Sequence, residues 1–169
     1  MTDFAADVPI LHLLCGKIAS GKSTLAQQLV NAPRTLVLSE DSWLAGLFGP
    51  EMKNVTDYVN YAARLRETLT PHLVALLNTG TSVVLDFPAN TIAQRQWMKQ
   101  VVMQARCAHI LHFLDEPDSL CKARLAVRNE AKSHNFAATE AEYALISRYF
   151  VAPASEEGFN IKRYCSHPG

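Results

Sequence analysis

An octapeptide with the sequence GKIASGKS, from Gly16 to Ser23, restricts what this chain can fold into more than any other feature. It matches the pattern G-x-x-x-x-G-K-[ST], which random sequence of average composition would contain in roughly one chain in a couple of hundred. The apolar run at residues 10–15 precedes it, and apolar residues at helical spacing over residues 24–31 follow it. Strand, glycine loop and helix in this order predict a phosphate-binding loop.

The residue types in this loop suit the triphosphate of a nucleotide. Its backbone N–H groups would point inward at the positive end of a helix dipole, where phosphate is stabilised. Glycines let the backbone approach phosphate oxygens, a lysine reaches the β and γ oxygens, and a serine hydroxyl can ligate Mg²⁺. The sequence therefore predicts that ATP with Mg²⁺ is bound by Gly16, Ala19, Ser20, Gly21, Lys22, Ser23 and Thr24.

The remaining pattern is typical of a single α/β domain of 169 residues. Further strands are predicted at residues 35–38, 82–85, 108–114 and 159–164. Helices are predicted at residues 57–78, 91–106 and 117–132, with Pro71 either kinking the first of these or beginning a second helix capped by Thr70. Because strands alternate with helices, we expect a P-loop NTPase fold, with a parallel sheet of about five strands and helices on both faces.

A helical lid is expected at about residues 118–150 of this single P-loop domain, which spans residues 1–169. The helix from residue 117 supplies its first part, and a capping box at residues 139–142 begins a second helical stretch. Arg124 and Arg128 lie four residues apart, so they share a helix face and can close over a transferring phosphoryl group. The alternative is a solvated basic face.

The bulk composition excludes several classes of partner and location. Sixteen Lys and Arg residues balance sixteen Asp and Glu residues, so the chain has no overall field that attracts polyanions. No apolar run approaches the roughly 18 residues of a membrane span. The four cysteines lack metal-ligand spacing, and no signal peptide precedes them. We expect a cytoplasmic protein with no membrane segment.

Two carboxylates follow predicted strands and are candidates for chemistry. Asp41 lies in the polar stretch at residues 39–42, which we predict to be an exposed acidic loop, although Asp41 could instead be the N-cap of a helix at residues 42–47. Asp86 ends the run VVL and could hold Mg²⁺ through water or orient an acceptor, or merely cap a turn. Phe87 follows it where a hydrolytic enzyme often has Glu, which favours transfer over hydrolysis.

A competing interpretation rests on Asp115 and Glu116, which follow the apolar run at residues 110–114. This pattern resembles the Walker B motif of ATP hydrolases, so an ATP hydrolase or an ATP-binding regulatory protein is the alternative. The chain has no LSGGQ-like signature and is too short for the helical lid of an oligomeric AAA motor. It also lacks the N-K-x-D and D-x-x-G sequences of GTP switches.

Taken together, these pieces resemble the small P-loop kinases of the predicted-kinase (AAA-type ATP-binding) group, related to polynucleotide kinases, zeta toxins and chloramphenicol phosphotransferase. The likeness covers nearly the whole chain. Its matching parts are the loop at residues 16–24, Asp41, the VVLD ending at Asp86, Arg95, Arg124, Arg128, the segment at residues 150–153 and the segment at residues 156–158.

The resemblance implies a function and roles for particular side chains. It implies that Asp41 receives the proton of an acceptor hydroxyl and that Arg95 faces the acceptor, the alternative for Arg95 being a surface position. Adenine would lie near Arg124 and the segment after Phe150. The implied reaction is transfer of the γ-phosphoryl group of Mg-ATP to a hydroxyl, with Lys22, Asp41, Asp86, Arg95, Arg124 and Arg128 as catalytic residues and Ser23 and Asp86 at the metal.

The sequence constrains the identity of the acceptor less, and it leaves the roles of several histidine and aromatic side chains less defined. Neutral net charge favours a small-molecule acceptor, with nucleic acid as the alternative. Histidines in the apolar strands, such as His12 and His112, are predicted to be core or edge residues. The aromatic residues Trp43, Phe48, Tyr58 and Tyr61 either pack in the core or stack on the acceptor.

Overall fold

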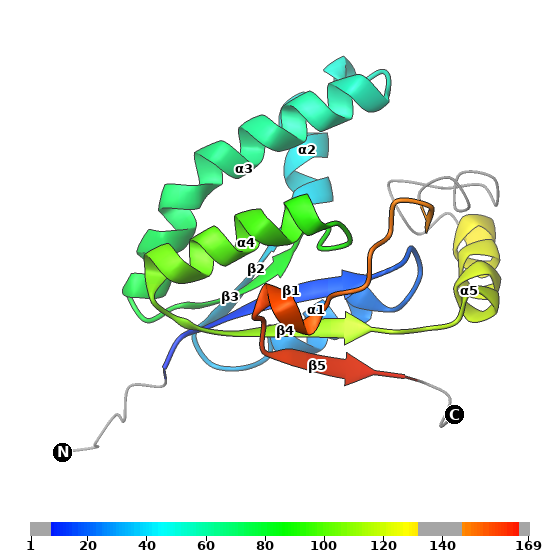
Figure 1. Ribbon diagram of the computed structural model, residues 1–169. Helices are drawn as coiled ribbons and strands as arrows, with labels where there is room; N and C mark the ends of the chain where they lie inside the picture. The colour runs from blue at the N-terminus through cyan, green and yellow to red at the C-terminus, as the bar shows by residue number, and fades with distance from the viewer. Residues whose placement is uncertain (1–7, 132–146, 166–169) are drawn as a thin grey trace.

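Five parallel strands form one sheet in the computed structural model, which describes residues 8–131 and 147–165. The spatial order is β2-β3-β1-β4-β5, and every neighbouring pair is parallel (Figure 1). All the predicted strands are present, although the last begins two residues later than predicted. The strands are β1 (Ile10–Gly16), β2 (Thr35–Ser39), β3 (Ser82–Asp86), β4 (Ala108–Leu114) and β5 (Ile161–Tyr164).

Helices cover both faces of this sheet, as the alternating pattern predicted. The helices α3 and α4 lie side by side on one face, α1 packs on the other, and α5 stands beyond the carboxyl ends of the strands (Figure 1). The α-helices are α1 (Lys22–Leu29), α2 (Glu40–Phe48), α3 (Val55–Asn78), α4 (Ile92–Ala105) and α5 (Asp118–Ala131), and short 3-10 turns are η1 (Gly49–Glu51) and η2 (Ser155–Glu157).

The central strand β1 is buried on both faces, which explains its uninterrupted apolar sequence. Leu11 and Leu13 contribute to the main core with α3 and α4. Leu14, whose side chain points to the opposite face, packs with Ala26 of α1 and Val84 of β3. The sheet is therefore the middle layer of three, and β1 lies where it is covered on both sides.

At the residue level one local prediction is wrong, and one of two alternatives is excluded. The stretch at residues 39–42 is not an exposed loop, because Ser39 caps α2 by accepting a hydrogen bond from Ser42 N, and Glu40 and Asp41 form the first helical turn. Carboxylates are favourable there because the helix dipole is positive at that end. No second helix begins at Pro71, since α3 continues through this residue.

The predicted caps and lid are partly within the described residues. Thr91 does cap α4, and it forms a capping box with Gln94, whose side chain accepts from the Thr91 backbone. The first part of the predicted lid is α5, whereas the predicted capping box at residues 139–142 lies outside the described residues. Within the described part of the chain, no helix is long and apolar enough to span a membrane.

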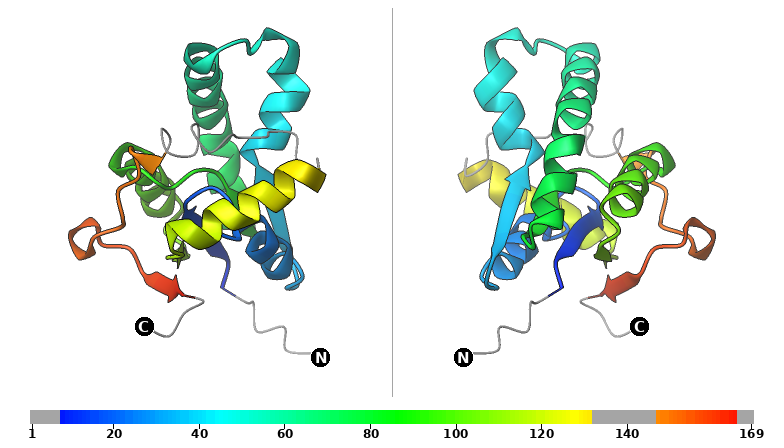
Figure 2. Two further views of the ribbon diagram at one scale, coloured as in Figure 1. Left: turned by 90° about the vertical axis from the view of Figure 1, so that its right-hand side faces the viewer. Right: turned by 90° about the vertical axis from the view of Figure 1, so that its left-hand side faces the viewer.

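Because the strands are parallel, their carboxyl ends meet at one edge, where ligands bind in sheets of this kind. The loops that follow β1, β2 and β3 all leave from this edge. Figure 2 (left) looks onto it: α5 crosses in front of the strand ends, and α2 and α3 rise above them. The fold thus brings the glycine loop, Asp41 and Asp86 to the same end of the molecule.

Candidate active site

The loop after β1 curls tightly around its own backbone. Ala19 and Gly21 both have positive φ, 62° and 105°, so consecutive peptide N–H groups turn toward the inside of the loop. A Cβ on Gly16 would lie 2.4 Å from Ser20 Oγ and 3.2 Å from the carbonyl oxygen of Leu114. Gly16 N also donates to Asn90 Oδ1 at 3.0 Å. Only a glycine fits at residue 16, as the phosphate-binding pattern requires.

Lys22 begins α1 with its ammonium group folded back over the loop. Its Nζ donates to the carbonyl oxygens of Gly16 and of Lys17, the latter at 2.9 Å. Burial lowers the pKa of Lys22 to about 8, and the nearby Cys15 and Asp86 act in the opposite direction. The loop therefore surrounds a cation that water solvates poorly, which suits an anionic ligand.

Asp86 acts directly on this lysine, and the carboxylates of Asp41 and Glu40 belong to the same group through their mutual electrostatics. Burial raises the pKa of Asp86, the Lys22 ammonium opposes that shift, and the Asp41 carboxylate adds to it. Burial is also the main cause that raises the pKa of Glu40, and both Asp41 and Asp86 contribute. The structure thus brings Lys22, Asp41 and Asp86 together, with Asp41 exposed and Glu40 only 1% exposed.

Glu40 is a residue of this site that our sequence analysis missed. It accepts a hydrogen bond from the Tyr58 hydroxyl, and its Oε2 lies 3.8 Å from Nη1 of Arg66. Burial and the neighbouring Glu40 raise the pKa of Tyr58. One signal was available in the sequence: Glu40 and the core residue Leu44 are four apart and lie on the same helix face.

The helix α5 docks directly on the phosphate-binding loop. Cys121 and Leu125 of α5 form a small buried cluster with Ile18 and Ala19 of the loop. Lys17 reaches over to α5 and pairs with Asp118 at 2.7 Å. These contacts hold the predicted lid helix against the loop in the structure.

Both lid arginines come from this docked helix. Arg124 donates through Nη1 to the carbonyl oxygen of Ser20 at 3.2 Å, and the same Nη1 lies 3.8 Å from where a Cβ on Gly21 would be. Burial lowers the pKa of Arg128, whereas the Asp41 carboxylate acts in the opposite direction. Arg128 Nε is buried and has no hydrogen-bond partner among the described residues. The two arginines therefore line the side of the site that faces the loop and Asp41.

Arg95 does not have the expected position. It is fully buried, pairs with Glu157 at 2.8 Å, and donates to the carbonyl oxygens of Ala89 and Val151. With no exposed surface, it neither faces an acceptor nor lies on the surface, so both expectations are wrong for this residue. Its contacts instead join α4 to the segment that precedes β5.

Several of the remaining candidates have partners away from Lys22. Asp115 is paired with Arg163 on the β5 side of the sheet at 2.8 Å, and the carboxylate that acts on the pKa of Lys22 is Asp86. His12 and His112 are buried and share a hydrogen bond of 2.9 Å, which agrees with their predicted place in the core. Among the aromatic residues, Phe48 stacks on Tyr61 at 4.3 Å between ring centroids and packs against the core.

The sequence was compared with models of known protein families. A family model described as an AAA domain matches residues 11–153, which is most of the chain. The chain belongs to this family. The match includes the phosphate-binding loop, Asp41, Asp86 and both lid arginines of this AAA domain. Among curated proteins, no match is found.

Solved structures place this AAA domain among P-loop kinases in fold. A suggested kinase from Chloroflexus aurantiacus superposes with a TM-score of 0.73 at 19% identity, over 95% of this chain and 89% of that one. The APS kinase of Mycobacterium tuberculosis, in complex with AMPPNP and APS, gives 0.60 at 17% identity over 96% and 91%. A sugar kinase from Janibacter sp. gives 0.61 at 14% identity over 94% and 85%. The predicted resemblance to the P-loop kinase group is confirmed.

Proposed function

We propose that this protein is a kinase that transfers the γ-phosphoryl group of Mg-ATP to a hydroxyl of a small-molecule acceptor. The observation that carries the proposal is the convergence of Lys22, Asp86 and Asp41 at the carboxyl edge of the sheet, with Arg128 of the docked α5 facing Asp41. A cation for the phosphates, carboxylates beside it and an arginine opposite them are the parts that phosphoryl transfer needs.

The loop residues fit a nucleotide triphosphate and its metal. The Ser20 hydroxyl is buried without a hydrogen-bond partner in the described residues, and Gly16 leaves room for nothing but backbone at the loop's first turn. The Ser23 hydroxyl is exposed beside this turn, and it would hold Mg²⁺ together with Asp86. When bound, Mg²⁺ neutralises charge on the phosphate oxygens. An APS kinase of the same fold has been solved with AMPPNP, which supports ATP as the donor.

We assign adenine to the space between Arg124 and the segment after Phe150. The Lys17 ammonium lies 5.6 Å from the centroid of the Phe150 ring, so this segment runs beside the phosphate-binding loop. Arg124 is anchored to the same loop through the carbonyl oxygen of Ser20. A guanidinium plane and an adjacent chain segment are suited to hold a planar base.

In the proposed reaction each side chain acts on charge or on a proton. Lys22 would exchange its two carbonyl partners for the β and γ oxygens, and the exposed Asp41 would accept the proton of the acceptor hydroxyl. Arg128 and Arg124 would stabilise the charge that develops on the transferring group. The docked α5 would exclude water and so suppress hydrolysis.

The test is ADP production from Mg-ATP by the purified protein, with and without pooled hydroxyl acceptors. Turnover should require an acceptor, and both Lys22→Ala and Asp41→Asn should reduce it by at least about a hundredfold, as expected for phosphate-binding and proton-accepting groups. Glu51→Gln, which neutralises an exposed carboxylate outside the site, is the matched control and should be without effect. Hydrolysis that is independent of acceptor, unaffected by Asp41→Asn and lost in Glu116→Gln would contradict the proposal and support the hydrolase alternative. An oligonucleotide that stimulates turnover more than every small acceptor would replace the small molecule by nucleic acid.

A further inference from the structure

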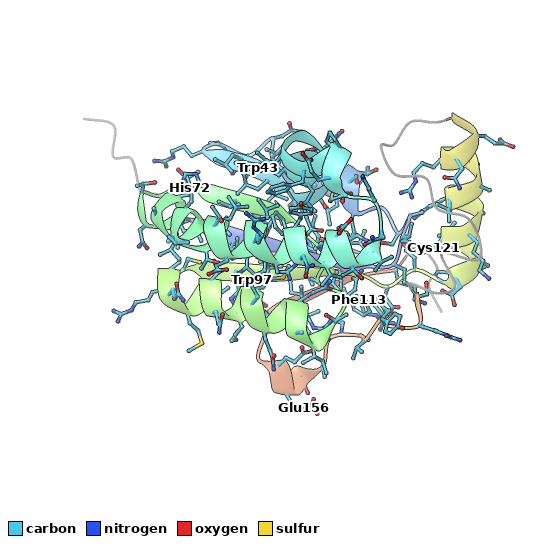
Figure 3. The ribbon with its side chains drawn as sticks, turned by 90° about the horizontal axis from the view of Figure 1, so that it is seen from above. Trp43, His72, Trp97, Phe113, Cys121 and Glu156 are labelled. Carbon is cyan, nitrogen blue, oxygen red and sulfur yellow. The ribbon has the colours of Figure 1, made fainter. Side chains whose placement is uncertain are left out.

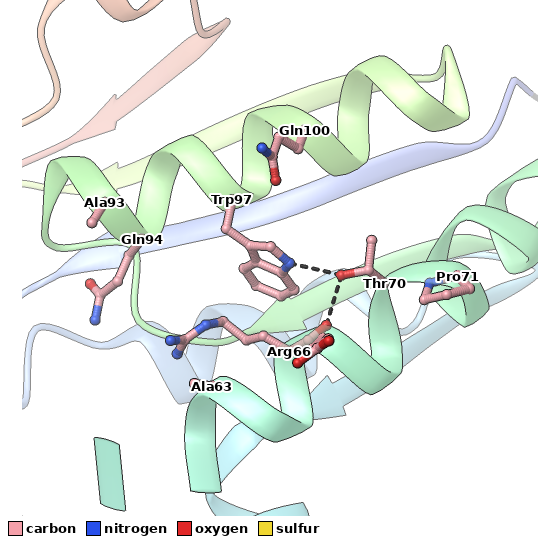
Figure 4. Close-up of a pocket in the computed structure, with 9 residues that line it drawn as sticks. Ala63, Arg66, Thr70, Pro71, Ala93, Gln94, Trp97 and Gln100 are labelled. Carbon is pink, nitrogen blue, oxygen red and sulfur yellow. Dashed lines mark hydrogen bonds between the residues drawn. The ribbon is translucent and has the colours of Figure 1, made fainter. Parts of the chain in front are cut away.

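A groove lies between α3 and α4, and none of its lining residues takes part in the proposed reaction. Its volume is about 510 Å³, and it is lined by Arg66, Thr70 and Pro71 of α3 and by Gln94, Trp97 and Gln100 of α4, among others (Figure 4). Seen from above, Trp97 lies between the two helices (Figure 3). The volume is in the range of small-molecule sites.

The aromatic wall of this groove is held in one orientation. The indole Nε1 of Trp97 donates to Thr70 Oγ1 at 2.9 Å, and the Thr70 hydroxyl donates to the backbone oxygen of Arg66 at 2.7 Å (Figure 4). Phe87 packs against the indole from the core, with ring centroids 5.6 Å apart. The Arg66 guanidinium lies 5.9 Å from the Trp97 ring centroid. A planar cation is therefore positioned against a fixed ring.

Two hydrogen-bond donors at this groove are available to a ligand. Among the described residues, no hydrogen bond is made by the Arg66 guanidinium, and its nearest carboxylate oxygen, Oε2 of Glu40, lies at 3.8 Å. Gln94 Oε1 accepts from the backbone N–H groups of Asn90 and Thr91, so its Nε2 is left as a donor. Figure 4 shows the Arg66 side chain extended toward the end of the groove where Gln94 stands.

This end of the groove is the one closest to the phosphate-binding loop. Asn90, one residue before the cap of α4, accepts from Gly16 N at 3.0 Å. On the α3 side, Arg66 faces Glu40, the residue directly before Asp41 in the first turn of α2. Through Glu40, the groove adjoins the helical turn of α2 that carries Asp41.

We propose that Arg66 and Gln94 bind an anionic group of the acceptor, a phosphate, sulfate or carboxylate, while its hydroxyl lies at Asp41. This inference rests on the proposed kinase function and names the acceptor class: a small hydroxylated organic anion. A guanidinium with free donors suits such a group, because it binds oxyanions through two parallel hydrogen bonds. Trp97 gives the carbon skeleton an apolar surface.

Two carboxylates near Arg66 compete with such a ligand only weakly. Glu40 lies beyond hydrogen-bond distance, and its burial raises its pKa, which disfavours the charged form that would compete. Glu67 also lines the groove, but it is exposed and its charge is screened by solvent. It can accept hydrogen bonds from further hydroxyls of the ligand.

Binding can be measured in the groove without turnover. The chain has two tryptophans, so Trp43→Phe leaves Trp97 as the reporter of intrinsic fluorescence. In this background, glucose 6-phosphate and glycerate are titrated beside their uncharged counterparts glucose and glycerol. At least one anion should change Trp97 emission. The concentration that it needs should be at least tenfold lower than the concentration that its uncharged counterpart needs. Arg66→Gln should weaken this binding at least tenfold, Arg66→Lys less, and Gln100→Ala, at the distant part of the groove, hardly at all.

Turnover separates this inference from the kinase proposal. With an anionic acceptor, Arg66→Gln should raise KM for the acceptor at least tenfold, with kcat changed less than about threefold and KM for ATP unchanged. Acceptor-dependent turnover that is equal for neutral and anionic compounds, or unaffected by Arg66→Gln, overturns the inference and leaves the kinase standing. Anion binding at Trp97 without acceptor-dependent turnover supports the groove as an anion site and overturns the kinase. If neither anion binding nor acceptor-dependent turnover is observed, both the anion-site inference and the kinase proposal are overturned.

Discussion

Individual residues in the phosphate-binding loop are constrained by contact distances more than by their chemical character. Gly16 faces a hydroxyl and a backbone carbonyl oxygen, whereas Gly46, inside α2, has no atom within 4 Å of where a Cβ would be. The two glycines therefore have opposite consequences when a methyl group is added. The same loop holds Lys22 in a desolvated position, which ties its charge to pH.

Gly16→Ala should destabilise the protein by about 1–3 kcal/mol, as overpacking typically does, and should weaken ATP binding. The carbonyl of Leu114 belongs to β4 and cannot move aside as a side chain could. Gly46→Ala should instead stabilise by about 0.5–1 kcal/mol, because glycine disfavours a helix interior. Urea unfolding of both variants measures this, and equal effects of the two substitutions would contradict the contact argument.

The affinity for ATP should fall as the pH rises through about 8. Burial has lowered the pKa of Lys22 to about 8, so the ammonium is present below that pH and is lost above it, while a bound polyanion favours the protonated form. At pH well above 8, the dissociation constant should increase by up to about tenfold per pH unit. Lys22→Arg should remove this pH dependence because arginine stays protonated. An ATP affinity of the wild-type protein that does not change between pH 7 and 9.5 would contradict the prediction.

At the level of elements, a buried arginine connects parts of the chain that are far apart in sequence. Arg95 of α4 binds Glu157 of η2 and carbonyl oxygens on both sides of α4, including that of Val151. This cluster fixes the segment that leads from the lid region into β5. A second ion pair, Arg163 with Asp115, joins β5 to the end of β4 but lies at the surface.

These two ion pairs should differ strongly in their contribution to stability. Arg95→Ala should cost about 3–5 kcal/mol in the free energy of unfolding, because it leaves buried acceptors without a donor. Arg163→Ala, with a largely exposed guanidinium, should cost about 0–1 kcal/mol. Glu157→Gln should cost less than Arg95→Ala, since its amide oxygen still accepts from Arg95. Chemical denaturation checks the order, and a cost for Arg163→Ala equal to that for Arg95→Ala would show that burial is not the cause.

At the scale of the whole molecule, the site is assembled from elements that lie far apart in the sequence. The loop and Lys22 come from β1 and α1, Asp41 from α2, Asp86 from β3 and the arginines from α5. Burial, together with the Asp41 carboxylate, raises the pKa of both Glu40 and Asp86. A ligand that bridges these elements is therefore expected to stabilise the entire fold.

Mg-ATP at about a hundred times its dissociation constant should raise the free energy of unfolding by about 2.7 kcal/mol. For a chain of this size, that corresponds to an increase in Tm of roughly 5–10 °C. Lys22→Ala should abolish the increase while leaving the Tm of the ligand-free protein within a few degrees of wild type. Arg66→Gln, outside the nucleotide site, should retain it. Thermal scans at fixed protein concentration test this, and a full shift in Lys22→Ala would exclude the loop as the binding site.

The sequence by itself determined the strands, most of the helices and the phosphate-binding loop. Apolar runs bounded by turn residues marked all five strands. The glycine pattern identified the loop because its residues are consecutive and have a fixed spacing. Local sterics and periodicity are properties of consecutive residues, so they are visible without the fold.

Only the tertiary structure decided which side chains meet. Glu40 and Asp41 are neighbours with the same charge, yet successive helix positions are about 100° apart, so Glu40 is buried against Tyr58 and Asp41 is exposed. Arg95 is buried because partners about sixty residues later fold over it. The groove at Arg66 exists only where α3 and α4 pack side by side. Such contacts depend on the relative placement of distant elements, and no local pattern in the sequence encodes that placement.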